Sequence, residues 1–181
     1  MIEIPHIQNT KRRALTLPGA VGGKTARNRI VVGPLCTMYA APDGSTTPQL
    51  IEYYRARARG GAAIVIVELT FIDDIASRSF HAQLGAHSDM MIPGLSDLAE
   101  AIKGEGAIAG LQIAHCGSQR VIGAGRVIAP SPIAWANDKP VPQEMNDEEI
   151  EQVLESFAAA AGRLAIAGFD LIELQGAHGY L

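Results

Sequence analysis

The sequence predicts an α/β fold, namely a partial (β/α)8 barrel with about its first four strands and an N-terminal hairpin. Four apolar segments of strand length alternate with three helical segments, which is typical of parallel strands joined by right-handed crossovers. The apolar segments span residues 30–35, 63–67, 108–113 and 171–174. Each is apolar nearly throughout, as a strand covered on both faces requires. No G-x-G-x-x-G sequence follows the first strand and no Walker sequence is present, which favours a barrel over an open nucleotide-binding sheet.

The segments between these strands have recognisable ends. Within residues 1–26, the run from Leu15 to Leu17 and the Gly-rich residues 18–23 predict a small hairpin that acts as a lid or plug. Thr47 is a suitable N-cap for a helix that starts at Pro48, and this helix is expected to end near residue 59.

Two further helices are expected. One covers residues 93–103, with an apolar stripe formed by Leu95, Leu98, Ala99 and Ile102. The other begins after Asn146 or Asp147 and ends near Gly168, and its expected buried stripe is Ile150, Val153, Leu154, Phe157 and Ala161. Residues 118–143 are rich in Gly and Pro and too long for a routine connection, so they are expected to form a functional loop.

Composition excludes several classes of protein. A chain of 181 residues suits a single domain, and 48% hydrophobic residues with a net charge of −4 argue against disorder and against electrostatic binding of nucleic acid. Cys36 and Cys116 lack metal-ligand spacing, so no metal site is expected. The N-terminus has no signal-peptide pattern and no membrane-spanning apolar run is present, so a cytoplasmic location is expected.

Candidate chemistry follows the fourth strand directly. Gln175, His178 and Tyr180 place an amide, an imidazole and a phenol within a few residues, and the carboxyl end of a barrel strand is where such groups form an active site. From these residues alone, a polar surface loop remains an equal alternative.

A family resemblance is carried by several motifs in a fixed order. The sequence NRIVVGPLCT at residues 28–37 is followed by Asp43-Gly44, by IVE at 66–68, by QIAHCG at 112–117 and by GAHGYL at 176–181. Together they resemble the old yellow enzyme family of flavin-dependent ene-reductases. The Cys36-Thr37 pair is most similar to the branch that includes 2,4-dienoyl-CoA reductase and related NADH:flavin oxidoreductases.

The resemblance implies a flavin site. FMN would lie non-covalently across the strand ends, beside Pro34, Leu35 and Cys36, and the Cys36 thiol would tune its reduction potential. Leu69 stands where the family usually has a small residue against the flavin. Gln112 matches the amide that faces the pyrimidine edge, where it can both donate and accept hydrogen bonds.

The resemblance also implies an ene-reductase mechanism. His178 and Gln175, which replaces a more usual His, would bind the carbonyl oxygen of an enone or enoyl thioester, with NADH or NADPH as electron donor. Tyr180 would protonate the α-carbon, because a phenol with an ordinary pKa of about 10 keeps its proton at neutral pH.

The expected barrel is only half complete. The family's later strands carry the flavin phosphate site, and an iron-sulfur cluster or FAD is expected only in a longer parent protein. The chain is therefore expected to be truncated, to pair with a complementary C-terminal half, or to form a homo-oligomer. A fragment that is inactive alone and serves as a structural subunit is the second function class. An unrelated sugar-phosphate barrel enzyme is disfavoured, because no lysine or acid pair stands at the strand ends.

Overall fold

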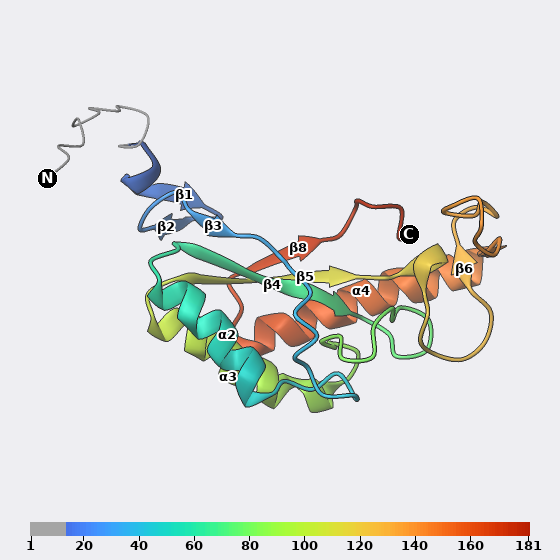
Figure 1. Cartoon of the computed structure of the whole chain (residues 1–181), viewed down its shortest axis with the longest axis horizontal. Helices are drawn as coiled ribbons and strands as arrows, with labels where there is room; N and C mark the ends of the chain where they lie inside the picture. The colour runs from blue at the N-terminus through green and yellow to red at the C-terminus, as the bar shows by residue number, and fades with distance from the viewer. Residues whose placement is uncertain (1–13) are drawn as a thin grey trace, which may run out of the picture.

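The computed structural model of this chain describes residues 14–181, and its centre is a four-stranded parallel sheet (Figure 1). The strand order is β3-β4-β5-β8, with every neighbouring pair parallel. The strands are β3 (Val31–Val32), β4 (Ile64–Phe71), β5 (Ile108–Ala114) and β8 (Leu171–Leu174). The predicted parallel order of the four strands is therefore confirmed.

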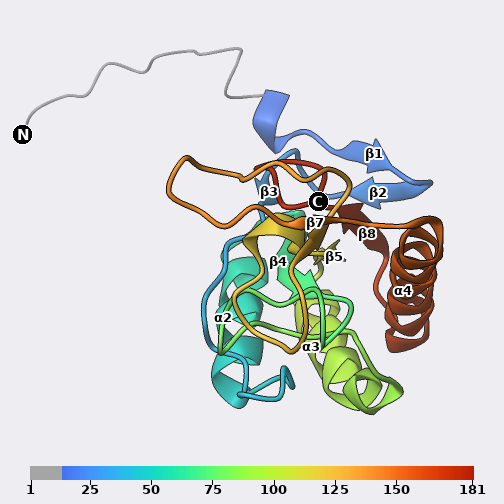
Figure 2. The same cartoon turned by 90° about the vertical axis from the view of Figure 1, so that its right-hand side faces the viewer.

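Three helices cover one face of the sheet (Figures 1 and 2). They are α2 (Pro48–Arg59), α3 (Ile92–Gly104) and α4 (Asp147–Ala167). The main core lies between these helices and the sheet, where alternate strand residues such as Val65, Val67 and Leu111 are completely buried. Residues on the opposite side of the strands, such as Gln112, therefore belong to the inner face, as the face without helices is called below.

A hairpin covers part of the inner face. Strands β1 (Gly19–Val21) and β2 (Lys24–Ala26) pair antiparallel, and Val21 and Ala26 pack with Ile64, Ile108 and Leu171. The predicted hairpin exists, but residues 14–16 are helical rather than extended. Residues 1–13 of the predicted lid lie outside the described part of the chain.

The first strand is shorter than its apolar run predicts. Residues 30–35 were expected to be extended and paired, but the ladder with β4 contains only Val31 and Val32. Pro34 has no N–H to continue the ladder, and Thr37 is instead hydrogen-bonded to Glu68 of β4. In contrast, β4 extends beyond the predicted segment to Phe71, with an irregularity between Val67 and Thr70.

The helix ends follow the sequence signals closely. The Thr47 side chain accepts a hydrogen bond from the Leu50 N–H at the start of α2. Asn146 and Glu149 form a capping box at the start of α4, and Gly168 ends this helix in the left-handed conformation.

The predicted buried stripe of α4 is partly wrong. Val153 is buried as expected, but Ile150 and Leu154 are exposed. In the described chain α4 packs mainly on α3 and β5, and the buried side of its C-terminal half is formed by Ala160, Leu164 and Ala167. Part of the apolar surface of α4 is therefore left uncovered in the described fold.

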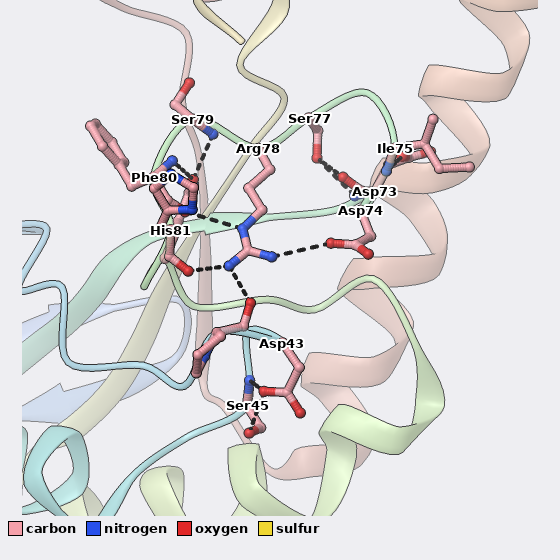
Figure 3. Close-up of polar contacts among 12 residues, drawn as sticks. Asp43, Ser45, Asp73, Asp74, Ile75, Ser77, Arg78, Ser79, Phe80 and His81 are labelled. Carbon is pink, nitrogen blue, oxygen red and sulfur yellow. Dashed lines mark hydrogen bonds and ion pairs between the residues drawn. The ribbon is translucent and has the colours of Figure 1, made fainter. Parts of the chain in front are cut away.

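The loop after β4 is held by one buried guanidinium (Figure 3). Arg78 donates to the backbone carbonyls of Pro42, Phe80 and His81 and forms an ion pair with Asp74 at 3.4 Å. Because Pro42 belongs to the loop before α2, these contacts tie two loops together at the carboxyl side of the sheet.

The remaining elements are short. Two are 3-10 turns, η1 (Asp89–Met91) and η2 (Gly117–Gln119). The other two are the short strands β6 (Ile128–Ala129) and β7 (Gln143–Glu144), which pair parallel in the segment between β5 and α4. No helix in the described residues 14–181 is long and apolar enough to cross a membrane.

Candidate active site

The carboxyl ends of the strands bring three of the predicted site residues together. Cys36 after β3, Leu69 in β4 and Tyr180 after β8 form one apolar cluster, together with Phe80, Ala114 and Cys116. These ends and their loops face the viewer in Figure 2, with the C-terminus among them. Residues far apart in the sequence thus form a common surface at the edge where barrel enzymes place their active sites.

The loop that carries His178 and Tyr180 is fixed by η2. The Gln119 side chain donates to the carbonyls of His178 at 2.6 Å and Gly179 at 3.1 Å, and the Ser118 N–H donates to the Tyr180 carbonyl at 2.9 Å. Gly117 has a φ of +48° and lies so close that a Cβ would overlap with the Tyr180 carbonyl. The position of Tyr180 therefore depends on a glycine after β5.

Two non-glycine residues have positive φ in the described chain, and both lie in loops at this edge. They are Met38, with φ 59°, and His178, with φ 65°. Such conformations are uncommon for residues with side chains and gather at functional sites, where surrounding contacts maintain them. The His178 side chain is exposed, so its imidazole is accessible to a ligand.

The side chains of Cys36 and Tyr180 in the cluster hold their protons at neutral pH. Burial, followed by the nearby charge of Glu68, raises the pKa of Cys36 to about 11, although a hydrogen bond from the Leu69 N–H opposes the shift. Burial also raises the pKa of Tyr180, with smaller contributions from Cys116 and Cys36. The site therefore presents a neutral thiol and a neutral phenol.

Gln112 lies on the inner face of β5, outside this cluster, and is oriented by an acid. Its Nε2 donates to Glu173 Oε1 at 2.6 Å, across a register in which the two residues are direct neighbours on β5 and β8. The Gln112 carbonyl oxygen has no hydrogen-bond partner among the described residues. The contact fixes the amide, so that its oxygen is available to accept from a ligand.

In Gln175, unlike in Gln112, the amide oxygen is the group that is hydrogen-bonded. Its Oε1 accepts from the Ala177 N–H at 3.1 Å, which shapes the start of the loop. The amide NH2 of Gln175 makes no hydrogen bond with described residues. The NH2 group of Gln175 is therefore available to donate to the oxygen of a ligand.

The three apolar candidates differ in exposure. Leu35 is 65% exposed, Pro34 is half-buried, and Leu69 is only 4% exposed because it packs inside the cluster. Leu35 therefore offers a flat aromatic ring a contact surface, whereas Leu69 offers little beyond its support of Cys36. The large side chain of Leu69 is accommodated inward, next to the small residue Ala114.

Sequence reasoning assigned no role to two acids and one tyrosine at this edge, although Glu68 stands within the IVE motif. Glu68 is completely buried and accepts hydrogen bonds from Thr37 and Tyr54, and Glu173 orients Gln112. The available signal was a single acid within each of two otherwise apolar strands, which is costly unless the acid has partners.

The fold and this edge are typical of barrel enzymes that place their active site at the carboxyl ends of the strands, and comparison with known proteins gives the family. Residues 15–181 match the NADH:flavin oxidoreductase / NADH oxidase family, and the chain belongs to this family. The resemblance to old yellow enzymes is thereby confirmed.

Individual relatives agree with this assignment. The chain is 40% identical over 159 residues to an NADPH dehydrogenase of Listeria welshimeri, covering 87% of this chain and 46% of that protein. It is 41% identical over 163 residues to an NADH:acrylate oxidoreductase of Vibrio harveyi, covering 88% of this chain and 16% of that protein. The structure of a 2-naphthoyl-CoA reductase in complex with 2-naphthoyl-CoA superimposes with a TM-score of 0.85 at 26% identity, covering 93% of this chain and 28% of that one. The chain therefore spans less than half the length of each of these proteins.

Proposed function

We propose that this chain supplies the N-terminal half of an FMN-dependent ene-reductase that reduces the activated C=C bond of an α,β-unsaturated carbonyl compound. The observation that carries the proposal is the meeting of Cys36 and Tyr180 at the carboxyl edge of a parallel sheet. A relative named for acrylate, which is an activated alkene, supports the reaction class. A neighbour with a bound aroyl-CoA supports a small-molecule substrate, including an enoyl thioester.

The residues at this edge fit FMN. The inner face offers the Gln112 amide, whose free oxygen can accept from the flavin ring N–H and whose second amide N–H can donate to a ring carbonyl. Pro34 and Leu35 offer apolar surface for the ring, beside the neutral thiol of Cys36. When bound, the FMN supplies a hydride equivalent that it receives from NADH or NADPH.

The chain's own residues would perform the other parts of the reaction. His178 and the NH2 of Gln175 would donate to the substrate carbonyl oxygen and stabilise the negative charge that develops there when the β-carbon accepts hydride. The Tyr180 phenol would transfer its proton to the α-carbon and regain one from solvent. Cys36 would contact the ring without transferring a proton, because its raised pKa keeps the thiol neutral.

We further propose that activity requires additional strands. Strands β3 and β8 have one neighbour each in the described sheet, and apolar Val31, Ile172 and Leu174 at these edges are exposed. Such edges are covered in stable proteins. We propose that a complementary C-terminal half covers them, as the rest of a longer polypeptide or as a separate chain, in a cytoplasmic enzyme. A homo-oligomer of this chain is the alternative, and in either case the chain alone would serve as an inactive structural half.

Reconstitution tests this function. The chain would be refolded with the part of the Listeria welshimeri NADPH dehydrogenase that it does not match, in the presence of FMN. NAD(P)H oxidation would then be followed under anaerobic conditions with and without an enone, so that the enone is the only electron acceptor supplied. We expect enone-dependent oxidation in the mixture and none with either half alone. A flavin-loaded mixture that oxidises NAD(P)H equally well without enone would contradict the ene-reductase proposal.

A further inference from the structure

Glu68 is a completely buried acid at the carboxyl side of β4, and its carboxylate makes all of its hydrogen bonds through one oxygen. Its Oε2 accepts from the Thr37 backbone N–H at 2.9 Å and from the Thr37 hydroxyl at 2.6 Å. The same oxygen accepts from the Tyr54 hydroxyl at 3.1 Å, and this hydroxyl in turn accepts from the Glu68 N–H at 2.9 Å. One acid thus connects the segment after β3 to helix α2.

The other oxygen of this carboxylate has no such contacts. Glu68 Oε1 is buried and has no hydrogen-bond partner among the described residues. A buried carboxylate with one unsatisfied oxygen costs free energy, and burial accordingly raises the pKa of Glu68 above its ordinary value against the opposing effect of its three donors. A structural link between Thr37 and Tyr54 could be made by a neutral group at lower cost, so the acid calls for an additional explanation.

Cys36 precedes the residue that Glu68 holds. Thr37 is bound through both its backbone and its side chain, so its position relative to β4 is fixed, and Cys36 is covalently fixed with it. The Cys36 side chain packs against Leu69, the residue after Glu68. Cys116 from the loop after β5 and Tyr180 from the loop after β8 share the cluster with Cys36, and the charge of Glu68 from β4 acts on its thiol.

We propose that Glu68 is a positioning residue for the Cys36 thiol. Its carboxylate holds the Cys36–Thr37 segment in place at the strand ends, and its negative charge opposes ionisation of the thiol. The significance of this role for flavin chemistry rests on the proposed function, since Cys36 is proposed to lie beside the ring. The positioning itself is a property of this chain and can be tested without flavin.

The test is the pH dependence of Cys36 alkylation by iodoacetamide in the full chain. The labelled cysteine is identified by peptide mass spectrometry, and Cys116 is completely buried. Glu68→Gln removes the charge and keeps the shape. We expect its alkylation profile to move to lower pH by about 1 unit, because a nearby like charge disfavours ionisation. At pH 8 the labelling rate should therefore rise by about tenfold.

A second variant tests the anchoring separately from the charge. Thr37→Val removes the hydroxyl contact but leaves the charge of Glu68, so we expect severalfold faster labelling at every pH without a shift of the profile. Tyr53→Phe is the matched control, because it keeps the ring that packs on Tyr39, Tyr54 and Arg57 and removes a hydroxyl that makes no hydrogen bond with Glu68. It should label like the wild type.

Either of two results overturns the proposal. One is an alkylation profile of Glu68→Gln that lies at the same pH as the wild-type profile. The other is a labelling rate of Thr37→Val that equals the rate of Tyr53→Phe at every pH. Circular dichroism checks the folding of each variant, and if Glu68→Gln fails to fold, the Thr37→Val comparison alone decides. Failure of flavin binding would leave these labelling results unaffected, so the two proposals can fail independently.

Discussion

Replacement of Tyr180 by Phe is expected to separate chemistry from structure. The Tyr180 hydroxyl makes no hydrogen bond with the described residues, while its side chain packs against the cluster of Leu69, Ala114 and Cys116. Phe keeps the ring and removes only the hydroxyl. The free energy of unfolding should therefore change by no more than about 0.5 kcal/mol, as for a substitution that removes no buried contact.

The catalytic effect should be much larger. If Tyr180 is the general acid, its removal should slow reoxidation of the reduced flavin by enone by about 10² to 10⁴-fold. Reduction of the flavin by NAD(P)H needs no proton from this position and should keep its rate. Stopped-flow absorbance of the flavin in the reconstituted assembly measures the two half-reactions separately.

The pH dependence of flavin reoxidation by enone follows from the ionisation of the Tyr180 phenol. Because burial raises the pKa of Tyr180 above its ordinary value of about 10, the proton donor is present at neutral pH and lost only as the pH rises above that value. The wild-type rate of reoxidation should therefore be constant from pH 7 to about 9. Equal slowing of both half-reactions in Tyr180→Phe, or of neither, would refute the assignment of Tyr180 as acid.

Two further substitutions test the parts that hold the site. Glu173→Gln should weaken FMN binding by the reconstituted assembly by about tenfold, because the charge-assisted hydrogen bond that orients the Gln112 amide becomes a neutral one. An unchanged affinity in a fluorescence titration would count against the role of Glu173 in orienting Gln112. Gly117→Ala should lower the free energy of unfolding by about 1 to 3 kcal/mol, since a Cβ would overlap with the Tyr180 carbonyl at a positive φ. Urea unfolding measures this, and Gly176→Ala, where a Cβ meets open space, should cost much less.

The parallel sheet could be predicted because its signal is local. Each buried strand is a short apolar run between turn residues, and the helix caps at Thr47 and Asn146 are single-residue signals. The strand predicted at residues 30–35 was too long, because an apolar residue can also lie exposed at the site edge instead of pairing in the sheet, as Leu35 does. In α4, Leu154 fits a helical stripe, but the described fold provides no partner for it.

The site was predictable only as far as the family's motifs extend. Cys36, Leu69 and Tyr180 lie in one apolar cluster, and their roles stay predictions. The Glu68 and Glu173 contacts could not be predicted, because they join residues that are 14, 31 and 61 positions apart. Such pairs depend on the register between strands and on the placement of α2, which no local pattern encodes.

The central claim is that this chain provides one half of a flavin site and needs the other half to hold FMN. The most direct measurement is an FMN titration followed by absorbance and by native mass, with the chain alone and with the complementary half of the Listeria welshimeri relative. We predict weak or no binding by the chain alone, and a complex with one FMN per pair of halves in the mixture. Stoichiometric FMN on the chain alone, or a mixture that binds no better than the chain, would contradict the account.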